Sequence, residues 1–342
     1  MGYIANMNQL DMLICWWKKD YRVFASKRFA GGGRFSDTDM IRYGEIDRAD
    51  DIVFDEKSDQ SFKEILTPVS QTLFFFTEDQ TKEASQPAKG AVIFLRNCDL
   101  SGLKRLDEMY LHNGPADSYY SKLRENVKFV LMGCSHSFDN CFCVSMGSNH
   151  AEGYDMAIDQ LSDDSFGLDC KDGSWAVTLE KLGCQQADVS PEYVTDNKIT
   201  VNISEDLSQN VMKSSMWREY DSRCINCGRC NFVCPTCTCF TMQDLYYSEN
   251  GKVGERRRVW ASCMVDGFTD VAGGGSYRQK NGDRMRFKVL HKVLDFRQRN
   301  GYNMCIGCGR CDDICPEYIS FSHILNKLDY AMDEVKSMEA AK

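Results

Sequence analysis

The chain has 342 residues, of which 43% are hydrophobic and 27% are charged, and its formal net charge is −9. This length is typical of two domains, and the composition is that of a globular protein that can bury sizeable cores. An acidic chain without a strongly basic domain argues against a nucleic-acid partner, and no apolar run approaches the ~18 residues that a membrane span needs.

The N-terminus lacks the charged, apolar and small-residue regions that make up a secretory signal. We therefore expect a cytoplasmic protein. Eighteen cysteines are many for such a chain, and they fall into short-spaced groups. In a reducing compartment this spacing favours metal ligation over a disulfide framework.

The N-terminal part predicts alternating helices and strands. Residues 8–19 read as a helix with an apolar face, and residues 91–95 form a continuous apolar run typical of a buried strand. A helical pattern over residues 100–110 and a second apolar strand over residues 127–132 follow. Strand, helix and strand at this length predict a βαβ unit, and hence an α/β or mixed N-terminal domain.

A group of four cysteines belongs to this part of the chain: Cys98, Cys134, Cys141 and Cys143. Cys98 follows the first predicted strand and Cys134 the second, so a parallel unit would bring both to the carboxyl edge of the sheet, where α/β proteins bind ligands. Four converging cysteines suffice for a third cluster or for one zinc ion, and we favour the cluster. Separate buried thiols are the alternative.

A domain boundary is expected near Ser214, which gives an N-terminal domain over residues 1–214 and a C-terminal domain over residues 215–342. Helices are predicted over residues 284–297 and 319–336. The expected fold class is therefore α+β and multidomain: an α/β or mixed domain, then a helical domain.

The C-terminal part contains an internal repeat. The motif Cys-x2-Cys-x2-Cys-x3-Cys-Pro, which is the bacterial ferredoxin run, occurs over residues 224–235 and again over 305–316. In two-cluster ferredoxins the fourth cysteine of each run ligates the other cluster. The repeat thus predicts two [4Fe–4S] clusters, one held by Cys224, Cys227, Cys230 and Cys315, and the other by Cys305, Cys308, Cys311 and Cys234. The C-terminal domain is therefore expected to be a helical ferredoxin-like domain with two clusters.

Zinc is the competing interpretation, since it also takes four thiolates, but zinc ribbons use pairs of Cys-x2-Cys rather than a run of three with a fourth Cys-Pro. A further group, Cys237, Cys239 and Cys263, stays unresolved between structural thiols and an extra site. Cys15, Cys170 and Cys184 stand alone, and we expect them to be packing residues.

Three roles remain open for the basic residues between the two runs: solvated surface, hydrogen bonding to cluster sulfurs, or docking of an acidic partner. They are Arg256, Arg257, Arg258, Arg278, Arg284, Arg286, Lys288 and Lys292. No acid–base constellation and no flavin or nicotinamide fingerprint is recognisable, so no catalytic residue is predicted.

Several segments resemble the iron–sulfur electron-transfer subunit of anaerobic sulfite reductases. They are residues 32–39 (GGRFSDTD), 140–147 (NCFCVSMG), 234–239 (CPTCTC), 256–264 (RRRVWASCM) and the final run at 305–316. More distantly, the chain is similar to the iron–sulfur β subunit of cytoplasmic sulfhydrogenases, which shares the CFC segment and the paired ferredoxin runs.

The resemblance implies an electron-transfer subunit of an oxidoreductase complex. Its partners would be a flavin subunit that oxidises NADH and a sirohaem subunit that reduces sulfite to sulfide. A relay subunit of a hydrogenase or another flavin-linked oxidoreductase is the first alternative. A structural or sensory metal protein with redox-silent clusters is the second.

Overall fold

The computed structural model describes residues 1–35 and 37–341, so Ser36, within the segment 32–39, lies outside the described residues. The chain forms two compact units, each built from three separate segments. The first unit comprises Met1–Phe138, Asn149–Thr195 and Met242–Val259, and the second comprises Asp139–Ser148, Asp196–Thr241 and the chain from Trp260 on. The ranges 1–214 and 215–342 stay a prediction about the domains.

An eight-stranded sheet is the centre of the first unit, in the order β10-β1-β9-β8-β7-β6-β2-β3. The four neighbouring strands β2, β6, β7 and β8 pair in parallel, and the outer pairs are antiparallel. The strands are β1 (Gly2–Ala5), β2 (Tyr21–Phe29), β3 (Met40–Glu45), β6 (Gly90–Arg96), β7 (Val127–Met132), β8 (Met156–Ser162), β9 (Ser165–Cys170) and β10 (Gln185–Gln186).

Both faces of this sheet are buried. Along β6, Val92 and Phe94 point into one core, and Ile93 and Leu95 point into another. The first core is closed by α1 (Met7–Trp17) and α5 (Gly173–Lys181), and the second by α2 (Lys63–Leu66), α3 (Asn97–Asp107) and α4 (Ser118–Arg124). The first unit also contains a 3-10 turn, η1 (Ala49–Asp51), and a π-helical turn, η2 (Glu108–His112). Burial on both sides explains why β6 is continuously apolar rather than alternating.

The predicted βαβ unit is confirmed, because β6, α3 and β7 follow one another and β6 pairs in parallel with β7. The predicted first helix and both strands also lie where they were expected. Arg96 is opposite Met132 in the parallel register, so Cys98 and Cys134 follow these strands at one edge of the sheet, as predicted.

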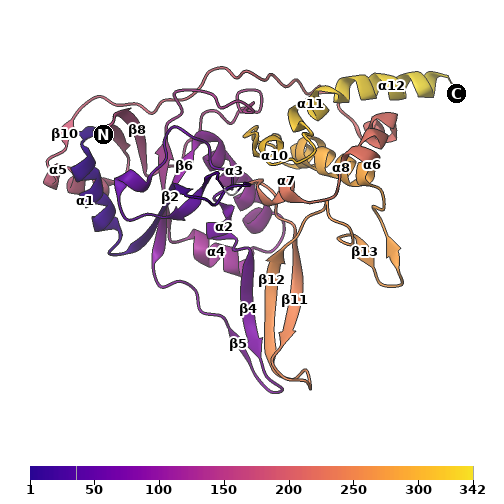
Figure 1. The fold of residues 1–342 in the computed structure, drawn as a ribbon, viewed down its shortest axis with the longest axis horizontal. Helices are drawn as coiled ribbons and strands as arrows, with labels where there is room; N and C mark the ends of the chain where they lie inside the picture. Colours follow the sequence, from indigo (N-terminus) through magenta and orange to yellow (C-terminus); the bar gives the residue numbers. More distant parts are fainter. Residues whose placement is uncertain (36, 342) are drawn as a thin grey trace. The chain divides into compact units, whose positions relative to one another are not determined.

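A second sheet joins distant parts of the chain in the order β11-β12-β4-β5 (Figure 1). Its strands are β11 (Phe240–Tyr246), β12 (Gly254–Trp260), β4 (Ser70–Phe76) and β5 (Thr81–Glu83). Gly254 pairs with Phe76, which inserts this late hairpin into the first unit.

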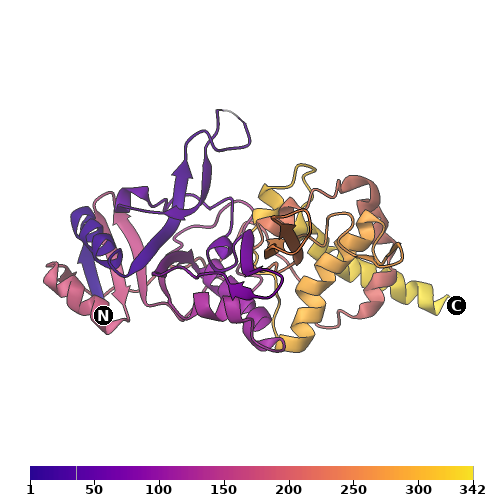
Figure 2. The same cartoon turned by 90° about the horizontal axis from the view of Figure 1, so that it is seen from below.

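The second unit is mainly helical (Figure 2, orange to yellow). Its helices are η3 (Gln209–Lys213), η4 (Ser215–Arg218), α6 (Glu219–Arg223), α7 (Arg229–Phe232), α8 (Asn281–Leu290), η5 (His291–Asp295), α9 (Phe296–Asn300), α10 (Arg310–Asp313), α11 (Phe321–Asn326) and α12 (Leu328–Ala340), beside a small hairpin of β13 (Asp270–Val271) and β14 (Gly275–Ser276). The predicted helix over 284–297 is confirmed as α8, the π-helical turn η5 and α9 in succession. The predicted last helix is divided into α11 and α12 at Lys327.

The fold class is therefore confirmed as a mixed α/β unit with a helical unit that carries the ferredoxin-type runs. Among the residues that the structure describes, none of the helices is both long enough and apolar enough to cross a membrane.

Candidate iron–sulfur cluster site

The two cysteine runs have left-handed residues at the same two positions. In the first run Asn226 and Gly228 have φ of 58° and 72°, and in the second Gly307 and Gly309 have φ of 64° and 70°. Gly228 and Gly309 directly precede the short helices α7 and α10. The sequence repeat is thus also a structural repeat, in which left-handed residues turn the loop between successive cysteines.

The one difference between the loops, Asn226 against Gly307, has a steric cause. A Cβ added at Gly307 would lie 2.5 Å from the carbonyl carbon and oxygen of Phe142, so only glycine fits there. Asn226 is a residue that tolerates the left-handed region, and its side chain is hydrogen-bonded to that of Asn281. Asn281 in turn donates to the carbonyl of Cys224 at 2.5 Å, which ties the first loop to the start of α8.

Three cysteines of the first run and two of the second line a common cavity. They are Cys224, Cys227, Cys230, Cys311 and Cys315, and they include the four that the sequence predicts for the first cluster. Apolar side chains, among them Met264, Met285 and Phe321, form much of the remaining wall. The amide of Ile319 donates to the Cys315 sulfur at 3.4 Å.

A second cavity mirrors the first. It is lined by Cys305, Cys308 and Cys311 of the second run and by Cys230 and Cys234 of the first, and these include the four that the sequence predicts for the second cluster. The amide of Gly307 donates to the Cys305 sulfur at 3.5 Å. The structure therefore brings the fourth cysteine of each run into the cavity of the other. Cys230 and Cys311 line both cavities, so the two cavities meet there.

The donor set suits a cluster better than a single ion. A tetrahedral zinc site with Zn–S bonds of about 2.3 Å needs its sulfurs about 3.8 Å apart. Among residues 1–35 and 37–341, no group of three or more histidine, cysteine, aspartate or glutamate residues closes around one ion in this way. Four cysteines in an apolar-walled cavity are the donor set that a [4Fe–4S] cubane takes.

Burial favours the protonated thiol at three of the predicted ligands, Cys224, Cys305 and Cys311. It raises the pKa of Cys305 to about 12, although the Gly307 amide acts in the opposite direction. Burial also raises the pKa of Cys224 and of Cys311. Because thiolates are the ligands, iron binding must release these protons.

Two buried lysines lie beside the cysteines. Lys288 lines both cavities, and Lys292 lines the second only. The Lys292 ammonium donates to the Thr236 carbonyl at 3.0 Å and to the Thr236 hydroxyl at 2.7 Å. Cations at this depth would offset negative cluster charge. Lys288 is also hydrogen-bonded to the side chain of Cys230, a predicted ligand, in line with the second of the roles left open for the basic residues.

The other basic residues have different partners. Arg256 and Arg257 pair with Asp244 and Glu255 on the second sheet, and the buried Arg258 pairs with Asp117 in the first unit. Arg284 pairs with Asp266, Arg286 pairs with Asp283, and Arg278 lies over the ring of Phe287. Of the eight, only the two lysines line a cavity with the predicted ligands.

The N-terminal quartet is divided between the units. Cys98 and Cys134 belong to the first unit, where Arg96 donates to the Cys134 sulfur at 3.6 Å. Cys141 and Cys143 lie in the segment Asp139–Ser148 of the second unit, and both are buried. A shared third cluster stays a prediction.

The segment Asp139–Ser148 supports the second loop, a role that the sequence did not reveal. The amide of Phe142 donates to the Gly307 carbonyl at 2.8 Å, and the hydroxyl of Ser148 donates to the Ile306 carbonyl at 2.5 Å. Asn140 donates to Asp313 at 2.6 Å. In the sequence, the one sign that another segment packs this closely is the glycine at position 307.

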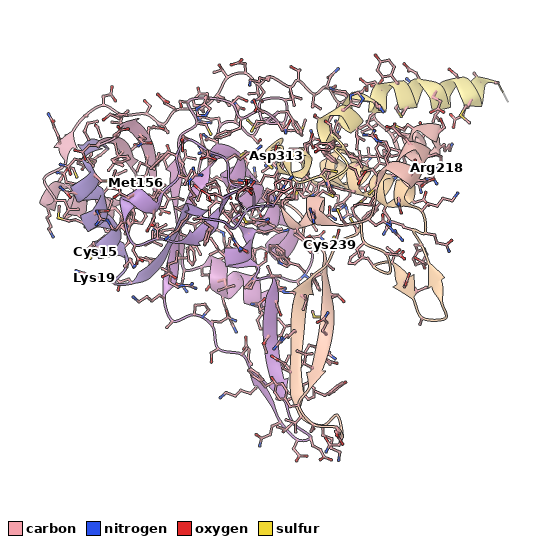
Figure 3. The ribbon with its side chains drawn as sticks, viewed as in Figure 1. Cys15, Lys19, Met156, Arg218, Cys239 and Asp313 are labelled. Atoms are coloured by element: carbon pink, nitrogen blue, oxygen red, sulfur yellow. The ribbon has the colours of Figure 1, made fainter. Side chains whose placement is uncertain are left out.

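The structure also shows the surroundings of Cys237, Cys239 and Cys263, whose role the sequence left unresolved. Cys239, at the start of the β11 hairpin (Figure 3), is hydrogen-bonded to Cys263, and this bond together with burial raises the pKa of Cys263. Asn231 donates to the Cys263 sulfur at 3.1 Å. Cys237 instead lies beside Lys292, to which it is hydrogen-bonded.

Of the three cysteines expected to be packing residues, Cys170 and Cys184 belong to the first core. The prediction is wrong for Cys15, which is exposed on α1 (Figure 3). Its neighbour Ile14 occupies the buried position on that turn.

Comparison with known proteins agrees with this site. Residues 223–319 match the model of a 4Fe-4S dicluster domain. The chain is 28% identical to the sulfhydrogenase 2 subunit beta of Pyrococcus furiosus over 301 residues, which are 84% of this chain and 88% of that protein. It is 22% identical to the F420-dependent formate dehydrogenase subunit beta of Methanocaldococcus jannaschii over 114 residues, 33% of this chain and 21% of that protein. No solved structure matches the chain.

The protein therefore carries a dicluster domain with two [4Fe–4S] clusters, and it is an iron–sulfur electron-transfer subunit of an oxidoreductase.

Proposed function

We propose that this chain relays single electrons within an anaerobic sulfite reductase complex, from an NADH-oxidising flavin subunit to a sirohaem subunit that reduces sulfite to sulfide. The observation that supports a relay is the pair of adjoining cavities, each lined by five cysteines and sharing Cys230, Cys311 and Lys288. Two redox centres side by side allow an electron to enter at one and leave by the other. The complex is proposed to work in the cytoplasm.

The proposed ligands follow the crossing of the two runs. Cys224, Cys227, Cys230 and Cys315 hold the first cluster, and Cys305, Cys308, Cys311 and Cys234 hold the second. A [4Fe–4S] cluster supplies one-electron chemistry when it is bound. The chain's own residues contribute the thiolates, two amide donors to sulfur and an apolar wall that excludes water.

Sulfite as the terminal acceptor is supported by the segments over 140–147, 234–239 and 256–264, which resemble the sulfite reductase family. A second candidate is an equivalent relay in a hydrogenase complex. It is favoured by the relative from Pyrococcus furiosus, which is a sulfhydrogenase subunit. Both candidates assign this chain the same chemistry and differ in the partner that receives the electrons.

The first measurement is iron and acid-labile sulfide on anaerobically purified protein. About eight irons per chain would limit the clusters to the two cavities. About twelve would support a third cluster on Cys98, Cys134, Cys141 and Cys143. Fewer than eight in fully loaded protein would contradict the ligand assignment.

The relay itself is tested in the assembled complex with Cys308→Ser. Cys308 lies in the second cavity, so this change should abolish NADH-driven sulfite reduction while dye-driven reduction by the sirohaem subunit remains. Cys15→Ser, on the exposed side of α1, is the matched control and should change neither rate. A surviving NADH-driven rate in Cys308→Ser would exclude the relay. Hydrogen-driven turnover with no sulfite reduction would favour the hydrogenase candidate.

A further inference from the structure

Helix α8 and the π-helical turn after it carry three buried cations at four-residue intervals. Arg284, Lys288 and Lys292 are 2%, 5% and 3% exposed. Residues four apart lie on one face of a helix, so the three form a stripe directed into the unit. Charged side chains are rarely buried this deeply without a partner, and Arg284 has Asp266 as its partner.

The two lysines face the cysteines to different extents. Lys288 lines the first cavity together with Cys224 and Cys227, and it also lines the second with Cys305 and Cys308. Lys292 lines the second cavity alone, where its ammonium is fixed by Thr236. Lys288 therefore lies at the junction of the two cavities.

Both lysines contact sulfurs of the cysteine-rich segments. Lys288 is hydrogen-bonded to the side chain of Cys230, and Lys292 is hydrogen-bonded to the side chain of Cys237. The carboxyl of Asp312 also interacts with Lys288.

We propose that Lys288 is a counter-charge shared by both clusters that raises the reduction potential of each, whereas Lys292 raises that of the second cluster only. The inference rests on the proposed ligand assignment. A fixed positive charge favours the state with one more electron, and charge near a cluster is one of the factors that set its potential. Because Lys288 acts on both centres, it raises their potentials together, whereas Lys292 changes the difference between them.

The test is an EPR-monitored redox titration of the full chain, purified anaerobically, with iron counted for every variant. In Lys288→Gln, both midpoint potentials should fall. At the wild-type midpoint potential of each cluster, the ratio of reduced to oxidised cluster in the variant should be at least tenfold lower. For a one-electron couple, this corresponds to a fall of about 59 mV in the midpoint potential. In Lys292→Gln, only one of the two midpoints should fall.

The matched control is Arg286→Gln, which removes a positive charge from the same helix. Arg286 pairs with Asp283 and lines neither cavity, so both midpoints should stay unchanged. The inference is overturned if Lys288→Gln shifts one midpoint only or neither, or if Arg286→Gln lowers both midpoints as far.

If Lys288→Gln loses iron and its potentials cannot be measured, Lys288→Arg, which keeps the positive charge, provides the test. Loss of both clusters in Lys288→Gln, with both clusters and both potentials retained in Lys288→Arg, supports the shared role. A tenfold shift of either cluster in Lys288→Arg overturns it. Fewer than eight irons in the wild-type chain would instead refute the ligand assignment, and the two failures are thereby distinguished.

Discussion

At the scale of single residues, the left-handed positions of the cysteine loops decide whether the loops can close. Gly307 and Gly301 both have positive φ, of 64° and 80°. A Cβ at Gly307 would lie 2.5 Å from the Phe142 carbonyl, whereas a Cβ at Gly301 would meet nothing within 4 Å. A side chain at either position would therefore strain the backbone, but only at Gly307 would it also collide with a neighbouring segment.

We accordingly expect Gly307→Ala to be much more damaging than Gly301→Ala. The latter should cost about 1 kcal/mol for the backbone conformation alone. The former should cost on the order of 2–3 kcal/mol more, since backbone must move, and it should lower iron at the second site. Anaerobic denaturant unfolding and iron counts measure both effects, and equal losses in the two variants would contradict this account.

The repeat made the cluster residues predictable, because the same cysteine spacing occurs twice and glycine or asparagine stands at every left-handed position. The burial of Lys288 and Lys292 was not predictable in the same way. Their neighbour Arg286 has the same charge but is only half-buried, and charged residues are most often exposed. Only the four-residue interval from Arg284 distinguishes the buried set.

At the scale of elements, the helix from α8 to α9 is interrupted by the π-helical turn His291–Asp295, a type of turn that is frequent at functional sites. This turn carries Lys292 towards Thr236 and stacks His291 on Phe287 with ring centroids 5.6 Å apart. Burial, and then the neighbouring charge of Lys292, lower the pKa of His291 to about 4.

This histidine should make the second unit less stable in mild acid. Its folded pKa is below the unfolded value of about 6.5, so the unfolded chain binds more protons as the pH falls through the window from 6.5 to 4. Between pH 8 and pH 5.5 we expect a loss of about 1 kcal/mol that His291→Phe removes. Chemical unfolding at the two pH values measures it.

His323→Gln, at an exposed position of α11, is the control and should leave the pH dependence as in the wild type. The account of the π-helical turn fails if His291→Phe loses as much stability in acid as the wild type does.

At the scale of the whole molecule, the two units are assembled from interleaved segments. The late hairpin of β11 and β12 joins β4 in the first unit, and the early segment Asp139–Ser148 belongs to the second. Local patterns predicted the helices and strands individually. They could not predict these assignments, because pairing Gly254 with Phe76 depends on which distant strand offers a free edge.

A fragment of residues 215–342 should therefore hold its clusters poorly. It lacks Phe142, whose amide binds the Gly307 carbonyl, and Ser148, whose buried hydroxyl binds the Ile306 carbonyl. We expect clearly fewer than eight irons per fragment after anaerobic reconstitution.

Within the full chain, Ser148→Ala leaves the Ile306 carbonyl without that donor and should cost about 1–3 kcal/mol. Ser135→Ala, at an exposed position of the first unit, should cost almost nothing. If the fragment of residues 215–342 bound as much iron as the full chain, the segment Asp139–Ser148 would be dispensable for cluster binding.

The crossing of the two cysteine runs also bears on how the protein is made. During translation Cys230 is synthesised well before Cys305, and at about 5–20 residues per second the interval is roughly 4–15 s. During that time the first three thiols have no fourth partner, because Cys315 comes later still. The first unit is incomplete until β12 has been synthesised. Iron must therefore be delivered late, and the nascent thiols must be kept reduced until then.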